Sequence, residues 1–132
     1  MKYVLDTHTW IWMHSFPEKL SPGVVKKLTT LKSEDALVLS AISLWEICKL
    51  VERGRIQLFE DLEEWVKQAL DVPGLQVHPL DFRVFYKSTT LPGEFHKDPA
   101  DQMIVATARL CDGVLITKDH QIQGYPHVKT FW

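Results

Sequence analysis

Four carboxylates lie beside predicted strand ends or helix starts, where a folded chain would bring them together. Asp6 directly follows a short apolar segment near the N-terminus, and Asp119 lies two residues after another apolar segment ends. Glu46 and Asp101 lie in the first turns of two predicted helices. Ligands of α/β proteins bind at the carboxyl ends of parallel strands, which helix N-termini often adjoin. We therefore expect these four side chains to converge on one cleft.

Such a cluster would favour a divalent cation. Two carboxylates about 4 Å apart repel each other by roughly 4 kcal/mol at an effective dielectric constant of 20, so several in one cleft either take up protons or bind a cation. An all-oxygen set of ligands suits Mg²⁺ or Mn²⁺. Because Mg²⁺ prefers sites that it shares with substrate phosphates, the cluster predicts phosphoryl transfer with a metal-activated water as nucleophile.

Some of these acids also have structural interpretations. Glu46 fits a Ser-x-x-Glu capping box in which Ser43 is the N-cap. Asp98 precedes Pro99 as an N-cap would, and Asp101 lies where the helix dipole favours an acid. For Asp98 we expect the structural role to dominate.

Other metals and motifs fit poorly. There is no H-E-x-x-H pair, and Cys48 and Cys111 lie far apart, so zinc is disfavoured. The phosphate-binding, dinucleotide-binding and nucleophile-elbow motifs are absent. A phosphatase would carry a second acid two residues after Asp6, where this chain has His8. His96 and His120 lie near the acidic edge in sequence and could touch substrate, although surface histidines are commoner.

Alternating strands and helices must position the acids. We predict strands at 3–5, 36–39, 75–78 and 114–117, and an edge strand at 128–131. Predicted helices lie around 10–12 and over 21–32, 43–53, 61–70, 81–89 and 98–110. This order predicts an α/β fold with a mostly parallel sheet of about four to five strands, covered on both faces.

Composition places the chain among ordinary globular proteins. Its 132 residues suit a single domain, 1–132, and 45% are hydrophobic and 24% charged. With 15 basic and 17 acidic residues the net charge is −2, so there is no overall basic footprint, although a local one is possible. No signal peptide and no run of about 20 apolar residues is present, so we expect a cytoplasmic protein without membrane contact.

Four blocks of sequence resemble the PIN-domain ribonucleases, in particular the VapC-type toxins of bacterial toxin–antitoxin pairs. They are Leu5–His8, Ser43–Ile47, His96–Ala108 and Leu115–Asp119. Their order and spacing match along nearly the whole chain. The Asp-Pro-Ala-Asp block, followed by an Ile-x-Ala-x-Ala helix, is the most specific part.

The resemblance implies a three-layer α/β/α PIN-like fold and RNA cleavage that depends on one or two Mg²⁺ or Mn²⁺ ions. Asp6, Asp101 and Asp119 would be the closest metal ligands, with Glu46 acting partly through water. The products would carry a 5′-phosphate and a 3′-hydroxyl. The family also implies a homodimer or higher homo-oligomer and a cognate antitoxin that covers the active site.

The resemblance extends to residues around the acids and to two departures. Thr7 and Thr117 match small hydroxyl positions beside the acids, and Asp98 matches a recurrent family acid. Gln102 and Lys118 occupy positions where the family often has Arg, which leaves one phosphate or structural contact unaccounted for.

Nearness in sequence to the acids makes three lysines candidate phosphate contacts: Lys49, Lys97 and Lys118. Each could equally be a solvated surface lysine. Trp10 and Trp12 cannot both face inward from a short helix, so one of these two rings could be exposed and belong to a dimer or antitoxin surface.

Three other functions stay open from the residues alone. They are a catalytically inactive RNA-binding module of the same fold, a Mg²⁺-dependent phosphatase or receiver-like phosphoacceptor, and a DNA nuclease. The presence of all four acids disfavours the inactive module. A receiver would need paired acids after its first strand and a lone Asp after its third, and neither is seen.

Overall fold

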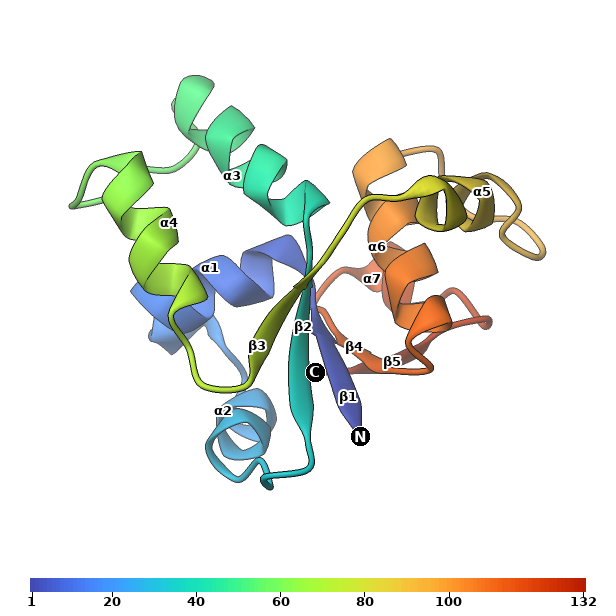
Figure 1. Cartoon of the computed structure of the whole chain (residues 1–132), viewed down its shortest axis with the longest axis horizontal. Helices are drawn as coiled ribbons and strands as arrows, with labels where there is room; N and C mark the ends of the chain where they lie inside the picture. The colour runs from blue at the N-terminus through green and yellow to red at the C-terminus, as the bar shows by residue number, and fades with distance from the viewer.

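A five-stranded parallel sheet lies at the centre of the protein, whose computed structural model describes residues 1–132. The strand order is β3-β2-β1-β4-β5, and every neighbouring pair is parallel (Figure 1). The strands are β1 (Lys2–Leu5), β2 (Ala36–Ser40), β3 (Leu75–His78), β4 (Val114–Ile116) and β5 (Lys129–Phe131). The predicted sheet and its edge strand are confirmed.

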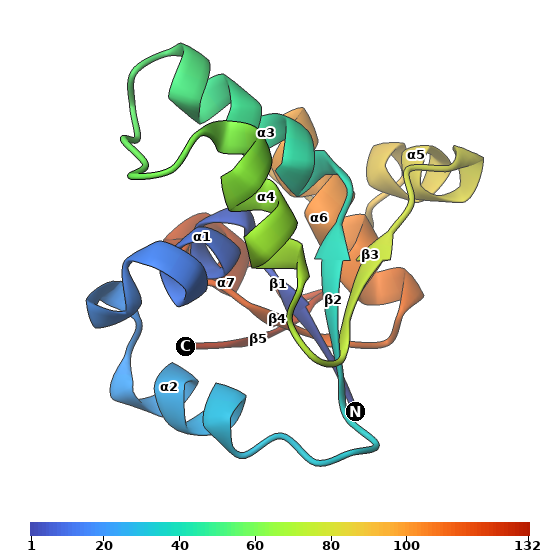
Figure 2. The same ribbon diagram turned by 60° about the vertical axis from the view of Figure 1, so that its left-hand side comes forward.

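Helices cover both faces of this sheet. They are α1 (Thr7–Ser15), α2 (Pro22–Thr29), α3 (Ile42–Glu52), α4 (Leu62–Leu70), α5 (Phe82–Thr89), α6 (Pro99–Leu110) and α7 (His120–Gln123), with a 3₁₀ turn, η1, at Pro17–Lys19. Helices α1 to α4 lie on one side of the strands and α5 to α7 on the other (Figures 1 and 2). The architecture is therefore a three-layer α/β/α sandwich. None of these helices combines the length and the apolar character that a membrane span requires.

Each inner strand supplies side chains to two cores. Leu5 and Leu39 pack in the core beneath α1 and α4, whereas Val4 and Val38 pack against α6 on the opposite face. Successive strand residues point to opposite faces, so a sheet buried on both sides needs apolar residues throughout. This explains why the inner strands β1, β2 and β4 show no alternation of apolar and polar residues.

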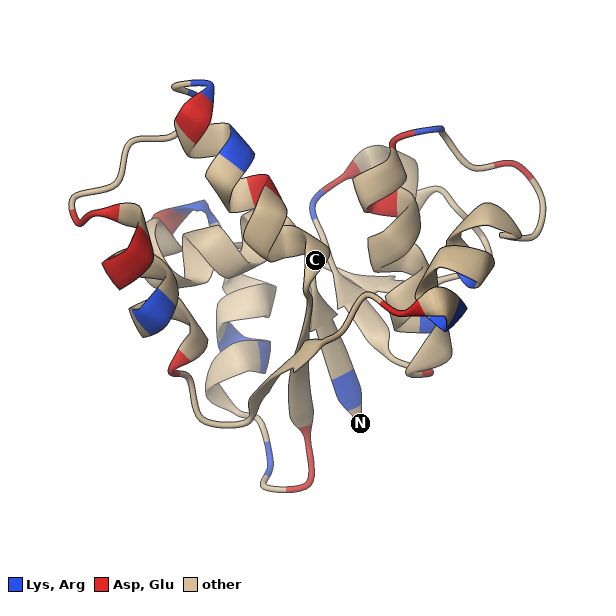
Figure 3. Ribbon diagram, turned by 45° about the horizontal axis from the view of Figure 1, so that its top comes forward, with Lys and Arg blue, Asp and Glu red and all other residues tan.

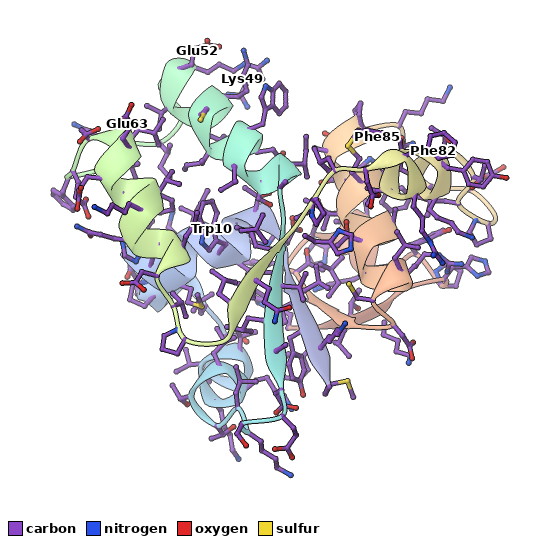
Figure 4. The ribbon with its side chains drawn as sticks, in the orientation of Figure 1. Trp10, Lys49, Glu52, Glu63, Phe82 and Phe85 are labelled. Carbon is purple, nitrogen blue, oxygen red and sulfur yellow. The ribbon has the colours of Figure 1, made fainter.

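Two buried tryptophans join α1 to α4. The rings of Trp10 and Trp65 meet edge to face with their centroids 5.0 Å apart. The indole N–H of Trp10 donates to the Ala69 carbonyl at 3.0 Å, and that of Trp65 donates to the Ser15 hydroxyl at 2.6 Å. Figure 4 shows Trp10 between the two helices. Trp12 is only partly buried and packs against the same core as Trp10, so only one of the two rings is fully inside, but neither is exposed as one of them was expected to be.

Helix boundaries follow local signals. Ser21 caps α2 by accepting from the Val24 amide at 3.0 Å, as the Ser-Pro pair predicts. The helix ends three residues before the expected Lys32, and the Thr29 hydroxyl bonds back to the Val25 carbonyl at 2.8 Å. The short elements η1 and α7 were not predicted, because three or four residues carry too little periodicity.

A close backbone approach seats β4 beside β1. A Cβ atom on Gly113, just before β4, would lie 2.9 Å from the Lys2 carbonyl oxygen. Only glycine allows this approach without a shift of the backbone. The approach places the C-terminal ends of β1 and β4 next to each other, and with them Asp6 and Asp119.

Candidate active site

Asp6 is a buried carboxylate at the end of β1, only 4% exposed. It caps α1 by accepting from the Thr7 amide through Oδ1 at 2.8 Å. Its other oxygen, Oδ2, accepts from the Thr117 hydroxyl at 2.6 Å. Both oxygens are therefore oriented by neighbours, one from its own helix and one from the residue that follows β4.

Thr117 also connects Asp6 to Asp119. The Thr117 hydroxyl accepts from the Asp119 amide at 3.0 Å while it donates to Asp6. The Asp119 carboxylate caps α7 by accepting from the amides of Gln121 at 2.8 Å and Ile122 at 3.2 Å. Asp119 thus has a capping role that the sequence did not reveal, because α7 was not predicted.

Glu46 is held by Thr7, and its predicted capping box is wrong. The N-cap of α3 is Ala41, which makes no side-chain cap. Ser43 lies inside the first turn, and its hydroxyl bonds that of Thr7 at 2.8 Å instead. The Thr7 hydroxyl donates to Glu46 Oε1. The helix begins earlier than expected, at Ile42, so Ser43 faces α1 rather than capping its own helix.

Asp101 lies in the first turn of α6. Asp98 caps this helix by accepting from the Asp101 amide at 3.1 Å, as predicted. Asp101 Oδ2 is 3.1 Å from Nε2 of His96, although this buried nitrogen makes no hydrogen bond of good geometry. The side-chain amide of Gln102 donates to the His96 carbonyl at 3.1 Å. Gln102 therefore has a structural contact, which holds the loop that brings His96 to Asp101.

His8 belongs to this site and was not identified from the sequence as a site residue. Its Nε2 accepts from the Lys118 amide at 3.0 Å, so in the neutral ring the proton is on Nδ1. Nδ1 lies 3.6 Å from Asp6 Oδ2. Burial lowers the pKa of His8, against the opposing influence of Asp6 and Asp119. The sequence feature that could have identified His8 is its position two residues after Asp6, the acid at the end of the strand. His120, which was expected near the acids, is exposed and makes no such contact.

The site disfavours negative charge. Burial, together with the neighbouring carboxylates of Asp6, Asp98, Asp119 and Glu46, raises the pKa of Asp101 to about 8. Burial also raises the pKa of Glu46, as do Asp6 and Asp98, against the hydrogen bond from Thr7. These mutual influences place the four predicted acids in one electrostatic neighbourhood. Figure 3 shows acidic positions on α3 and α6 facing each other beyond the ends of the strands.

The carboxylate oxygens of the four acids are suitable ligands for a hard divalent cation, but these side chains are not arranged as a coordination shell. No three or more His, Cys, Asp or Glu side chains are arranged to hold a metal ion. Asp6 and Glu46 are instead engaged by the hydroxyls of Thr117 and Thr7, and Asp101 lies against His96. A cation would relieve the repulsion that raises the pKa of Asp101, and carboxylate oxygens are the ligands it prefers.

The three candidate lysines differ in their surroundings. Lys118 Nζ lies 5.7 Å from the ring centre of Trp12. Lys49 forms an ion pair with Glu52. Lys97 is exposed and makes no ion pair. The backbone amide of Lys118 donates a hydrogen bond to His8, which lies against Asp6. Of the three lysines, only Lys118 is connected to the acids in this way.

Comparison of the sequence with known proteins identifies relatives along nearly the whole chain. The model of the PIN domain matches residues 3–128. Ribonuclease VapC22 of Mycobacterium tuberculosis is 32% identical over 132 residues, a match that covers 98% of this chain and 97% of the relative.

Solved structures share the fold. One is the crystal structure of VapBC2 from Rickettsia felis bound to a promoter DNA fragment, with a TM-score of 0.74 and 15% identity, covering 99% of this chain and 98% of that one. A toxin–antitoxin complex from Klebsiella pneumoniae gives a TM-score of 0.64 at 20% identity, covering 96% and 94%. At these identities the structural matches establish the three-layer fold.

Proposed function

The chain belongs to the PIN-domain family, and on that premise we propose that it is a metal-dependent endoribonuclease and the toxin of a toxin–antitoxin pair. The observation that carries the proposal is Asp101, whose pKa is raised to about 8 by burial and by the carboxylates around it. A half-buried acid crowded by other carboxylates favours a bound cation, and a relative with 32% identity is a ribonuclease. A metal-assisted phosphodiester hydrolase accounts for both facts.

Asp6, Asp101 and Asp119 would hold Mg²⁺ or Mn²⁺, one ion or two, with Glu46 acting partly through water. The ion, when bound, supplies Lewis-acid polarisation of the phosphate and makes water more acidic. Oxygen ligands suit both metals, so the donor set does not choose between them.

The chain's own residues prepare these donors. Thr117 orients Oδ2 of Asp6, and the Thr7 amide orients Oδ1. The Thr7 hydroxyl holds Glu46 and is itself held by Ser43. Partners of this kind typically change metal affinity or activity 10- to 100-fold when they are lost. We therefore assign Thr7 and Thr117 as positioning residues and Asp98 as the cap that begins α6.

We propose partners by analogy with the relatives. The Klebsiella structure is a toxin–antitoxin complex, so a cognate antitoxin that covers the acidic cleft is expected here, together with a homodimer or higher homo-oligomer. The substrate would be RNA in the cytoplasm, and its phosphates would meet Lys118, Lys97 or Lys49.

The test is cleavage of a mixed RNA pool by the purified protein with Mg²⁺ or Mn²⁺. Parallel reactions contain chelator, the Asp101→Asn variant, or Asp112→Asn as a matched acid-to-amide control. Asp112 is exposed and pairs only with Lys129. We expect cleavage to be lost with chelator and with Asp101→Asn but kept with Asp112→Asn, and the products to carry 5′-phosphates.

Each contrary result has a distinct meaning. Cleavage that persists in Asp101→Asn would refute the assigned site. RNA binding without cleavage by the wild-type protein would favour the inactive module, and cleavage of DNA alone would favour a DNA nuclease. Phosphate release from monoesters without RNA cleavage would favour the phosphatase.

A further inference from the structure

Helix α3 presents an exposed tryptophan among cations beside the acidic site. Trp45 is 54% exposed, although a ring of this size is usually well buried. Lys49 Nζ lies 5.9 Å from the centre of the Trp45 ring, within the range of a cation–π contact. A hollow of about 250 Å³ is lined by both residues and also by Arg53, Arg55 and Glu46. The aromatic and basic side chains thus share one hollow with an acid of the proposed active site.

A second hollow adjoins the first. Its volume is about 370 Å³, and its lining includes Trp12, Phe16, Lys19 and His8. Lys19 Nζ lies 5.6 Å from the ring centre of Trp12 and 5.0 Å from that of Phe16. Because Arg55 lines both hollows, they form one continuous surface. His8, which lies against Asp6, connects the second hollow to the acids.

The end of α3 places Arg55 between the two hollows. Gly54 has a positive φ of 67°, which ends the helix in the left-handed conformation. The chain then turns back, and the Arg55 amide donates to the Leu50 carbonyl at 2.9 Å. Neither Arg53 nor Arg55 forms an ion pair, so both guanidinium groups are free to bind an anion. Lys49 is partly neutralised by Glu52, and Figure 4 shows this pair on the outer end of α3.

The alternation of aromatic faces and free cations suits single-stranded nucleic acid. Proteins hold single strands by stacking bases on aromatic rings and tracking phosphates with Lys and Arg. A duplex hides its base faces and could not use Trp45 in this way. The cations are a local feature, because the whole chain carries a net charge of −2.

We propose that Trp45, Arg53, Arg55, Trp12 and Lys19 form an aromatic–basic strip that binds single-stranded RNA next to the cleavage site. A base stacks on Trp45, the two arginines bind the adjacent phosphates, and the strand continues toward Trp12 and Lys19. This inference rests on the proposed ribonuclease function and adds to it the path of the substrate and its single-stranded form.

The test measures binding separately from cleavage. Fluorescence anisotropy of a short, labelled, single-stranded RNA of mixed sequence is recorded in chelator, where the proposed metal-dependent cleavage is off. We expect Trp45→Ala to weaken binding at least about fivefold, and Trp45→Phe to retain most of the affinity because it keeps an aromatic face. Arg55→Ala should lower the slope of log affinity against log salt by about one. A duplex of the same sequence should bind more weakly than the single strand.

Matched controls come from α5. Tyr86 is 53% exposed, close to the value for Trp45, and belongs to a different helix. Figure 4 shows two other aromatic residues of that helix, Phe82 and Phe85. We expect Tyr86→Ala and Arg83→Ala to bind the RNA as the wild-type protein does. Light scattering on every variant tests whether its oligomeric state is unchanged.

The proposal is overturned if Trp45→Ala binds like the wild type, or if Tyr86→Ala weakens binding equally. It is also overturned if Trp45→Ala changes the oligomeric state, since the strip would then be a contact between copies of the chain. If the variants bind RNA normally but lose affinity for the antitoxin, the strip is a protein-docking surface and the proposal fails. Binding that depends on Trp45, in a wild-type protein that cleaves nothing in Mg²⁺, would refute the ribonuclease function while leaving the strip intact.

Discussion

The hydroxyl of Thr117 donates a hydrogen bond of 2.6 Å to Oδ2 of Asp6, although the two residues are 111 positions apart in the sequence. The bond joins the end of β1 to the residue after β4. The same hydroxyl accepts from the Asp119 amide, so one oxygen atom positions two of the proposed metal ligands.

Thr117→Val removes the hydroxyl and preserves the shape of the side chain. We expect a loss of roughly 1–3 kcal/mol in the free energy of unfolding, because Asp6 and the Asp119 amide each lose a buried partner. Cleavage should fall by about 10- to 100-fold, and Thr117→Ser should restore much of it. Urea denaturation and RNA cleavage measure the two effects. Thr107→Val is the control, because the buried Thr107 hydroxyl bonds only the Met103 carbonyl of its own helix; equal loss of cleavage there would contradict the prediction.

Stability without metal should depend on pH through Asp101. Its pKa is raised to about 8 in the folded protein, against about 3.9 in an unfolded chain. Between these values the folded state binds more protons, so the contribution is fully present below about pH 4 and is lost as the pH rises through about 8. The raised pKa of Glu46 acts in the same direction.

Thermal unfolding in chelator checks this linkage. The Tm of the wild type should fall between pH 5 and pH 8 more steeply than that of Asp101→Asn. At pH 8 we expect the variant to be the more stable protein, by at least about 1 kcal/mol. Asp112→Asn should follow the wild-type curve. Parallel curves for the wild type and Asp101→Asn would refute the raised pKa.

Divalent cations should stabilise the folded protein at pH 8. An ion that binds only the folded state adds about 2.7 kcal/mol when its concentration is 100 times its Kd. The Tm should therefore rise with the logarithm of Mn²⁺ or Mg²⁺ concentration, and chelator should reverse the rise. Asp6→Asn and Asp101→Asn should abolish most of it, whereas Asp112→Asn should not. A rise of the same size in all four proteins would place the ion elsewhere.

His8 should be neutral near neutral pH and carry its proton on Nδ1. The Lys118 amide can only donate, so it fixes Nε2 as the acceptor, and burial lowers the pKa of the ring from its ordinary value of 6.5. Long-range ¹H–¹⁵N NMR at pH 7 distinguishes the two nitrogens. A proton on Nε2, or a charged ring at pH 7, would contradict the structure.

Much of the fold could be predicted from the sequence, because its signals are local. The apolar strands, the Ser21-Pro22 start of α2 and the Asp98-Pro99 start of α6 each lie within a few adjacent residues. Asp6 directly follows an apolar strand, and Asp101 lies in the first turn of a helix whose start is recognisable. The predicted topology was therefore enough to place both acids at the edge of the sheet. Three expectations stay predictions: that residues 1–132 form a single domain, that the four acids have the assigned roles, and that the lysines contact phosphate.

The partners of those acids could not be predicted, since they come from distant parts of the chain. The neighbouring residues predict that Ser43 caps the helix that contains Glu46. Its hydroxyl instead forms a hydrogen bond with that of Thr7, which lies 36 positions earlier. The exposure of Trp45 likewise depends on which face of α3 the neighbouring helices cover. Local patterns determine the elements and mark the acids because they rest on short-range sterics and hydrogen bonds. Only the order of strands and helices decides which side chains meet, because such contacts join residues that no local rule connects.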